Sequence, residues 1–136
     1  MPVDHRLIVM RVGDVENAVN EIRRLAAIPF EDLSIDQVYS LRYNIIVLVE
    51  SLVSIAVHIL SEEYGYRATS YSDAIEQLCR RLRVRCIEDL KALIKLRNLL
   101  VHRYWEINDK LIHENVRNDF RCVEELLERV NEVLMA

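Results

Sequence analysis

The sequence predicts an all-α protein: an up-and-down helical bundle of about five helices, formed by a single domain over residues 1–136. Three observations predict this class. Only two glycines and two prolines occur, whereas an all-β fold needs turn residues about every ten positions. Hydrophobic residues make up 51% and charged residues 29% of the chain, as is typical of a globular domain. Long segments place apolar residues three and four positions apart, which is the spacing of an amphipathic helix.

The first predicted helix covers about residues 4–27, and the second covers about residues 35–63. Pro29 ends the first helix. Ser34 and Gln37 form a capping box that begins the second, which closes before Gly65. Because apolar residues cover most of its circumference, the second helix is expected to be the most buried. The apolar stripe of the first helix consists of Ile8, Val12, Val15, Val19, Ile22 and Ala26.

Three polar residues interrupt the apolar second helix in a regular way. Glu50, Ser54 and His58 follow one another at intervals of four, so they share one face of the helix. Such a polar stripe faces a partner helix, a subunit interface or a cleft, or else its groups satisfy one another. The spacing is compatible with each of these arrangements.

Three further helices are predicted in the second half of the chain. A short helix begins at Ser70 and runs to about Arg81, and the fourth covers about residues 86–105. Asn108 or Asp109 caps the last helix. The residues expected to face the core are Ile87, Leu90, Ile94, Val101 and Tyr104 in the fourth helix, and Ile112, Val116, Phe120, Val123, Leu127, Val130 and Leu134 in the last.

The segment from Arg97 to Tyr104 carries the most informative residues of the chain. It reads Arg-Asn-Leu-Leu-Val-His-Arg-Tyr, so an arginine, an amide, a histidine and a tyrosine interrupt an otherwise aliphatic helix. Packing does not explain why these polar residues occur together. Arginine binds phosphate oxygens through paired N–H groups, and histidine titrates near neutral pH. The set therefore suits proton transfer at a phosphate group.

Two of these side chains do not meet on a regular helix. At about 100° per residue, Arg97 and His102 point about 140° apart, whereas Asn98 and His102 lie one turn apart. A compact site therefore needs either a loosening of the helix near Val101 or a second copy of the chain. A simpler interpretation is that Arg97 forms a structural ion pair and His102 caps the helix.

The net charge of −4 conceals a basic segment around this motif. Residues 79–103 contain eight Lys or Arg against two Asp or Glu, whereas the rest of the chain has ten basic and twenty acidic residues. A local positive field attracts a polyanion such as RNA even when the whole protein is acidic. A solvated basic helix face balanced by acidic neighbours explains the same charges equally well.

Several classes of protein lack their sequence features here. No metalloprotease motif, paired-aspartate cluster or glycine-rich phosphate loop occurs, so no metal or other cofactor is expected. The N-terminus fits no secretion signal, and the apolar segment 45–60 is too short for a confident membrane span. The three cysteines have no CxxC spacing and are expected to be reduced core residues of a cytoplasmic protein: Cys79, Cys86 and Cys122.

The Arg-x4-His-x-Tyr pattern resembles the signature of HEPN-domain proteins, and in particular of the HepT-like toxin family. The resemblance extends over most of the chain. Residues 41–59 look like the second helix of that family, and residues 70–74 look like the start of its third. Residues 96–105 are similar to its signature helix, including the amide of Asn98 that follows the arginine.

This resemblance implies a helical bundle that pairs as a homodimer, so that two copies of the motif line one cleft. It implies the toxin of a toxin–antitoxin pair, usually a metal-independent endoribonuclease that needs no cofactor. The partner in such a pair is a small nucleotidyltransferase antitoxin. It silences the toxin by adding AMP to the tyrosine of the motif, here Tyr104.

Carried over to this sequence, the resemblance implies that Arg97 and His102 are catalytic and that Asn98 supports them. Glu50 matches a family position and is interpreted as holding Arg97. Two alternatives remain: a HEPN bundle that binds nucleotide and docks the nucleotidyltransferase without cleaving RNA, and a purely structural helical dimer. The residues interpreted as contacts to the RNA backbone are Arg42 and Arg103.

Overall fold

The computed structural model describes residues 3–116 and 120–136, and these ranges contain α-helices and short 3-10 helices without a β-strand. The all-α class predicted from the sequence is therefore confirmed. In chain order, the helices of the described ranges are α1 (His5–Ala26), η1 (Phe30–Asp32), α2 (Ile35–Tyr64), α3 (Tyr71–Leu82), α4 (Ile87–His102), η2 (Tyr104–Glu106), α5 (Asp109–Asn115) and α6 (Arg121–Met135).

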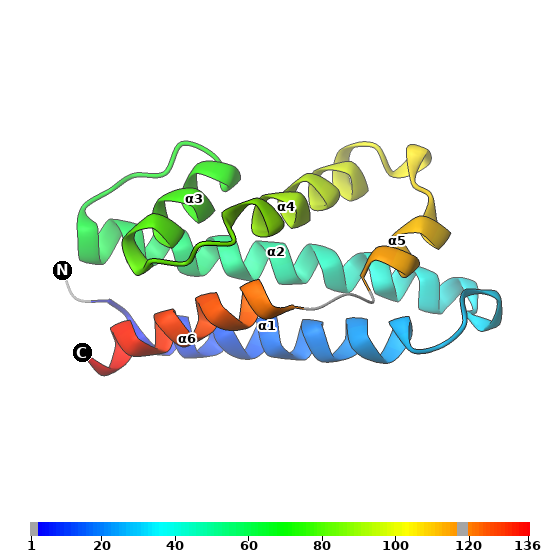
Figure 1. The fold of residues 1–136 in the computed structure, drawn as a ribbon, viewed down its shortest axis with the longest axis horizontal. Helices are drawn as coiled ribbons and strands as arrows, with labels where there is room; N and C mark the ends of the chain where they lie inside the picture. The colour runs from blue at the N-terminus through cyan, green and yellow to red at the C-terminus, as the bar shows by residue number, and fades with distance from the viewer. Residues whose placement is uncertain (1–2, 117–119) are drawn as a thin grey trace.

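The two long helices, α1 and α2, pack side by side in opposite directions (Figure 1). Their ends are the ones predicted from the sequence. Ser34 accepts from the backbone N–H of Gln37, whose side chain accepts from the Ser34 N–H, so the capping box is present. Gly65 adopts a left-handed conformation with φ of 61° and ends α2, as a residue without a Cβ does most easily.

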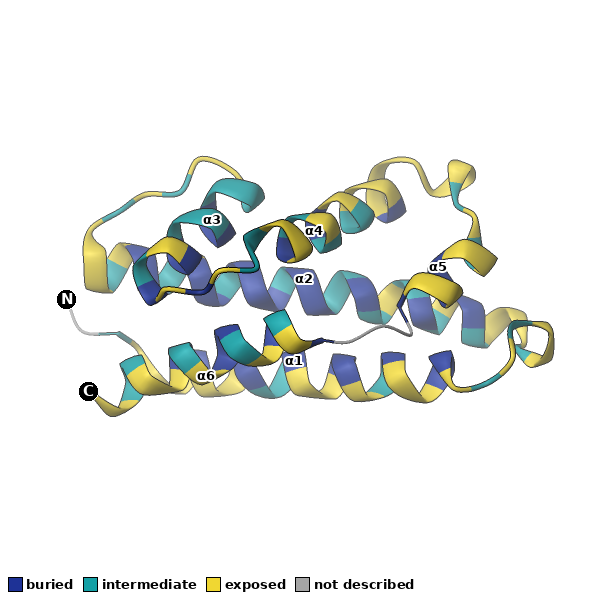
Figure 2. Ribbon diagram, in the orientation of Figure 1, coloured by how far each residue is buried: buried dark blue, intermediate teal, exposed yellow. Residues whose placement is uncertain are grey.

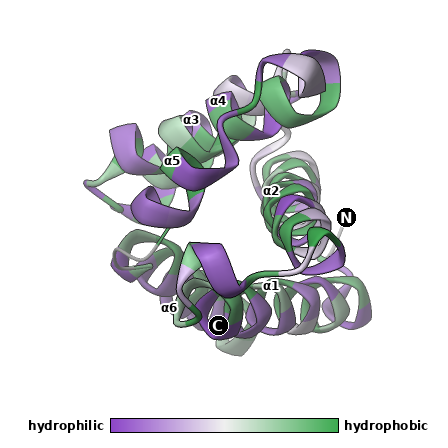
Figure 3. Cartoon of the chain, turned by 90° about the vertical axis from the view of Figure 1, so that its right-hand side faces the viewer, coloured by the Kyte–Doolittle hydropathy of each residue, from purple (hydrophilic) through white to green (hydrophobic). Residues whose placement is uncertain are grey.

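Two of the remaining helices, α3 and α4, cover α2 from the other side. Helices α3 and α4 lie across α2 from α1, and α6 runs past α1, α3 and α4 (Figures 1 and 3). Buried positions are concentrated on α2 and on the sides of the other helices that face it (Figure 2). The largest fully buried side chains are Ile8, Ile22, Leu25, Ile45, Leu48, Ile55, Ile59, Leu60, Ile75, Leu78, Leu90 and Leu126.

By length and composition α2 is apolar enough to cross a membrane. In this fold, however, its apolar surface packs against α1, α3 and α4 and forms the centre of the core. The core helix of a soluble protein has these same properties.

Helix α4 ends earlier than the sequence predicts, at His102 instead of about residue 105. As α4 approaches this end it diverges from α2, so the neighbouring helices no longer cover it (Figure 1). For this reason the predicted inward positions of Val101 and Tyr104 are wrong: their exposed fractions are 38% and 62%. Leu100, one residue before Val101, is buried instead.

The last predicted helix is two helices in the structure. Asn108 caps α5 by accepting from the backbone N–H of Leu111, as predicted, but α5 ends at Asn115. Helix α6 begins at Arg121, and residues 117–119 between them lie outside the described ranges. The predicted apolar stripe nevertheless reaches the core, because Ile112, Val116 and Phe120 are all buried.

The cysteines differ from the expectation of three separate reduced residues. Cys86, just before α4, forms a disulfide with Cys122 in the first turn of α6, with a Cα–Cα distance of 5.9 Å. Only the packing of α4 on α6 brings these two cysteines together, since 36 positions separate them in sequence. Cys79 is the buried free cysteine, and burial raises the pKa of its thiol to about 11.

Candidate functional site

The motif occupies the end of α4 and the turn that follows. Arg97 and Asn98 lie within the helix, and His102 is its last residue. Arg103 leaves the helical conformation with φ of −136° and ψ of 43°, and Tyr104 begins the 3-10 turn η2. The helix therefore loosens immediately after His102, one residue beyond the position suggested by the sequence. The part of α4 that joins Arg97 to His102 remains regular.

Arg97 is held by the carboxylate that the sequence suggested as its partner. Its Nε donates to Glu50 Oε1 at 2.7 Å, and its Nη2 lies 2.6 Å from the same oxygen. The exposed fraction of the Arg97 side chain is 16%, so the charge is largely withdrawn from water. An unpaired buried charge is costly. The ion pair and hydrogen bond with Glu50 therefore keep the charge of Arg97 stable in this position.

A tyrosine that the sequence reasoning missed completes this arrangement. The Tyr71 hydroxyl donates to Glu50 Oε2 at 2.7 Å, and the Arg97 guanidinium carbon lies 4.7 Å from the centre of the Tyr71 ring. This is the distance of a cation–π contact. The hydrogen bond to Glu50 is the main cause that raises the pKa of the Tyr71 hydroxyl; burial and the negative charge of Glu50 add to the rise.

Asn98 supports the arginine. Its Oδ1 accepts from Arg97 Nη1 at 2.9 Å, so the amide fixes the far side of the guanidinium. A guanidinium has five N–H groups, of which Glu50 and Asn98 engage three. In the part of the chain that the structure describes, the other two have no partner. They are available to an external oxyanion.

His102 contrasts with this fixed group. It is exposed at the end of α4, and no hydrogen bond, ion pair or ring contact to its side chain occurs within residues 3–116 and 120–136. Tyr104 is also exposed, and its ring meets the ring of Trp105 edge-on at 5.3 Å. Arg97 and His102 are therefore not brought into contact within one chain, although both lie at the same end of α4.

The polar stripe of α2 does not satisfy itself. Glu50 binds Arg97 and Tyr71, Ser54 accepts from Arg11 Nε at 3.2 Å, and His58 Nε2 accepts from the Asp4 backbone N–H at 2.8 Å. Glu50 thus bonds to α3 and α4, whereas Ser54 and His58 bond to α1 and its N-cap residue. The stripe lines an open hollow of about 500 Å³ between α1, α2 and α3, and its Glu50 end adjoins the motif. The cleft predicted as one alternative for this stripe is present.

The two predicted RNA-backbone arginines are placed differently. Arg42 forms a two-pronged ion pair with Asp109 at 2.7 and 2.8 Å, and this hydrogen bonding raises the pKa of Arg42. Asp109 was not singled out in the sequence, and only the docking of α5 on α2 brings it there. Arg103 is exposed beside the motif and lies 3.5 Å from Glu106. Of the two guanidinium groups, that of Arg103 is the more accessible.

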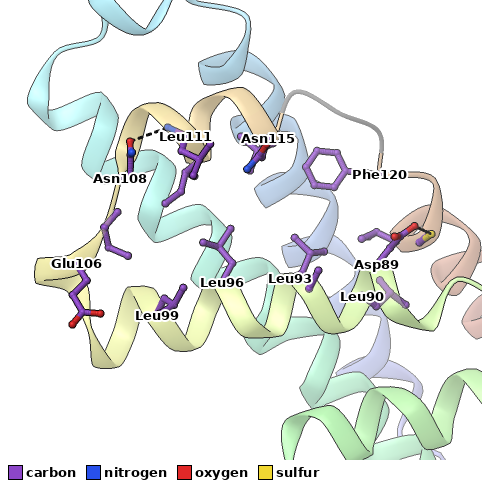
Figure 4. A pocket seen from close by; sticks show the side chains of 16 residues that line it. Asp89, Leu90, Leu93, Leu96, Leu99, Glu106, Asn108, Leu111, Asn115 and Phe120 are labelled. Atoms are coloured by element: carbon purple, nitrogen blue, oxygen red, sulfur yellow. Dashed lines mark hydrogen bonds between the residues drawn. The ribbon is translucent and has the colours of Figure 1, made fainter.

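A hollow of about 680 Å³ lies on another face of α4 (Figure 4). Leucines of α4 point across it toward α5 and Phe120. Neither Arg97 nor His102 lines it, so it is separate from the polar groups of the motif. Within the described residues, no cluster of three or more His, Cys, Asp or Glu side chains is placed to hold a metal ion.

Sequence reasoning found the motif but missed the residues that hold it in space. Tyr71 and Asp109 lie 26 and 67 positions from the arginines that they contact, counting from Arg97 and Arg42. No periodicity connects residues so far apart. The signal that was available for Tyr71 was its place at the predicted start of a helix, next to Ser70.

Comparison with known proteins gives the family of the chain. No curated protein matches the sequence. The family described as "HepT-like: Ribonuclease HepT-like" matches residues 15–130, a range that contains Glu50, Tyr71 and the complete motif. This match confirms the resemblance seen in the Arg-x4-His-x-Tyr pattern. The chain belongs to the HepT-like family.

Proposed function

We propose that this protein is the toxin of a toxin–antitoxin pair and acts as a metal-independent endoribonuclease. The membership of the HepT-like family, which is described as a ribonuclease family, supports the general activity. Arg97 and His102 are the proposed catalytic residues, with Asn98 and Glu50 supporting Arg97. The proposed antitoxin is a nucleotidyltransferase that silences the site by adding AMP to Tyr104.

The held guanidinium of Arg97 is the observation that carries this proposal. Glu50 and Asn98 fix its orientation while leaving two N–H groups for a phosphate. A donor that is already oriented loses no energy to reorganisation when negative charge develops on the phosphate. A purely structural ion pair would not require an amide on the far side of the guanidinium.

The proposed chemistry uses the ribose 2′-hydroxyl as the nucleophile. The 2′-oxygen forms a bond to phosphorus as the bond from phosphorus to the 5′-oxygen breaks. His102 takes the proton of the 2′-hydroxyl or delivers one to the leaving 5′-oxygen. The products are a 2′,3′-cyclic phosphate and a 5′-hydroxyl, and DNA is spared because it lacks the 2′-hydroxyl.

We propose a homodimer because one chain keeps Arg97 and His102 apart. The uncovered end of α4 supports such pairing, since it exposes apolar surface on Leu99, Val101 and Trp105. Surface of this kind is typical of a protein–protein contact. In the dimer, two copies of the motif face one cleft and supply both groups to one phosphate.

Tyr104 suits its proposed role because its hydroxyl is on an exposed turn directly after α4. An AMP group there adds a phosphate charge two residues from His102. That charge repels the RNA phosphate, and the bulk of the nucleotide blocks its approach. Arg103 is proposed to contact the RNA backbone. Arg42 is proposed for the same role, but it has to leave Asp109 in order to do so.

Cleavage of labelled RNA in the presence of EDTA tests this function. Unmodified protein is expected to yield 2′,3′-cyclic phosphate ends, and His102→Ala is expected to be slower by about 10²–10⁴-fold. His5→Ala is the matched control, because His5 is exposed in the first turn of α1, away from the motif.

The outcome separates the alternatives. Equal cleavage by wild type and His102→Ala contradicts the proposed catalytic role. If several RNAs remain intact while mass spectrometry shows Tyr104 unmodified, the nuclease proposal fails. The protein is then a HEPN bundle that docks the nucleotidyltransferase without cleaving RNA.

A further inference from the structure

Tyr71 contacts both members of the ion pair that holds the motif. Its hydroxyl donates to Glu50, and its ring lies against the guanidinium of Arg97. It is the first residue of α3, so it approaches the pair from a third helix, whereas Glu50 comes from α2 and Arg97 from α4. Three helices thus meet at one guanidinium.

The hydroxyl of Tyr71 fixes the rotation of the Glu50 carboxylate that faces the arginine. Oε2 accepts from Tyr71 at 2.7 Å, while Oε1 accepts from Arg97 Nε at 2.7 Å. The Glu50 side chain is 39% exposed, so water competes for both oxygens. With the hydroxyl removed, Oε2 turns toward water and the carboxylate is free to rotate. Arg97 then loses its fixed partner.

The ring of Tyr71 limits the arginine from a second direction. The guanidinium carbon of Arg97 lies 4.7 Å from the centre of the Tyr71 ring. The guanidinium can slide parallel to the ring, but the ring blocks its movement toward Tyr71. Together the ring, the carboxylate and the Asn98 amide restrain the guanidinium on three sides. The two unpartnered N–H groups are then held in fixed directions.

Tyr71 is itself fixed in place by the start of α3. Ser70 caps the helix by accepting from the backbone N–H of Asp73 at 3.0 Å. Ala74 and Ile75, in the same first turn, are buried in the core. The backbone of Tyr71 therefore cannot follow a displacement of Arg97, as a residue in a free loop would.

We propose that Tyr71 is a positioning residue that sets the orientation of Arg97 through Glu50. This inference rests on the proposed ribonuclease function, in which Arg97 stabilises the phosphate in the transition state. Tyr71 does not touch the RNA. Loss of the Tyr71 hydroxyl reduces the rate of the chemical step. RNA binding stays largely unchanged, since other groups bind the RNA backbone.

The first test compares Tyr71→Phe with Tyr66→Phe. Both remove a hydroxyl that donates to a carboxylate and keep the ring, but Tyr66 donates to Asp73 and does not contact the motif. Tyr71→Phe is expected to lower kcat by about tenfold and to change KM by less than about twofold. Tyr66→Phe is expected to keep the wild-type kcat. An unchanged kcat in Tyr71→Phe overturns the proposal.

A double-mutant cycle with Glu50→Ala tests whether Tyr71 acts through Glu50. If it does, Tyr71→Phe causes no further loss of kcat once the carboxylate is absent. Independent, multiplicative losses in the double variant contradict the proposal. General unfolding is excluded by comparing the thermal melting of all four proteins.

A measurement without RNA separates this proposal from the proposed function. The Nε–H of Arg97, which donates to Glu50, is expected to exchange with water faster in Tyr71→Phe than in wild type or Tyr66→Phe, as followed by NMR. If the wild type cleaves no RNA, the ribonuclease function fails and the catalytic part of this inference fails with it. An unchanged exchange rate overturns the positioning role by itself.

Discussion

The two ends of the motif are built in opposite ways. Arg97 is part-buried and restrained by Glu50, Asn98 and Tyr71, which come from three helices. His102, five residues later on the same helix, is exposed and without a hydrogen-bond partner among the described residues. The fold therefore fixes the orientation of Arg97 but not that of His102. Under the proposed function, the phosphate-binding group is oriented in advance and the proton-transfer group is placed by the second copy of the chain.

This difference fits the proposed site, in which the arginine and the histidine that act on one phosphate come from two copies of the chain. If both groups were fixed within one chain, their angular separation of about 140° would prevent them from reaching one phosphate. An exposed histidine at a helix end can instead face a cleft formed by two copies.

Mixing two inactive variants tests whether the site is shared between chains. Arg97→Ala and His102→Ala are each expected to have almost no activity. After unfolding and refolding together, half of the dimers are mixed, and each is expected to have one intact site of two. Activity then returns to about a quarter of the wild-type level. Co-refolding of each variant with itself is the control, and no recovery in the mixture contradicts a site assembled across two chains.

The disulfide fixes the opposite end of α4 and gives the next largest effect. Cys86 and Cys122 close a loop of 36 positions, so the bond is expected to raise the free energy of unfolding by about 4 kcal/mol. Urea unfolding with and without a reductant measures this difference. Because Arg97 is held locally by Glu50 and Tyr71, cleavage of RNA is expected to be the same in both states.

The control for this prediction is Cys86→Ser with Cys122→Ser, whose stability should not respond to the reductant. Cys79 does not confuse the result, since it is buried and its thiol has a raised pKa. A loss of cleavage on reduction would mean that the disulfide at the beginning of α4 orients the helix, and that local contacts alone do not hold Arg97.

The two catalytic candidates are expected to differ in their effect on stability. Arg97→Ala leaves Glu50 without its charged partner and the Tyr71 ring without its cation, so it should cost about 1–3 kcal/mol of unfolding free energy. His102→Ala removes no contact and should change stability by less than about 0.5 kcal/mol. Chemical denaturation measures both. Arg103→Ala is the matched control for a lost arginine, because Arg103 is exposed. Equal losses for Arg97 and His102 would refute the difference between the two ends.

The sequence predicted those parts of the fold that depend on neighbouring residues. The capping box at Ser34, the end of α2 at Gly65 and the cap at Asn108 are all confirmed, since each depends on side chains within three residues of a helix end. The division of the last helix into α5 and α6 was missed. There the apolar spacing continues through the interruption, so periodicity gave no sign of it.

The site was predictable only where its residues are contiguous. Arg97, Asn98 and His102 are found by their spacing on one helix, and the guess that Glu50 holds Arg97 needed the family position. Tyr71 and the Cys86–Cys122 bond depend on how α3, α4 and α6 are placed on α2. The errors at Val101 and Tyr104 have a similar origin. Both lie on an apolar stripe, but α4 has already diverged from its neighbours at that point.

The smallest expected effect concerns Asp73, which lies in the first turn of α3, the helix that begins with Tyr71. The backbone N–H of Thr69 is the main cause that lowers the pKa of this carboxyl, and the Tyr66 hydroxyl also donates to it. A carboxyl whose pKa is lowered in the folded state adds stability above its ordinary pKa and loses it as the pH falls through the folded value. Asp73→Asn is therefore expected to be less stable than wild type at pH 7, and the difference should shrink toward pH 3.

Urea unfolding at several pH values measures this dependence, with Asp36→Asn as the control. Asp36 also lies in the first turn of a helix, but it is exposed at the start of α2, away from the motif. A difference between wild type and Asp73→Asn that is constant from pH 7 to pH 3 contradicts the role of the charge. Asp73→Asn is expected to keep the wild-type kcat, because the Ser70 cap and the buried turn at Ala74 hold Tyr71 in place without it. A lowered kcat would mean that the position of Tyr71 depends on Asp73, and Tyr66→Phe would then not serve as a control for Tyr71→Phe.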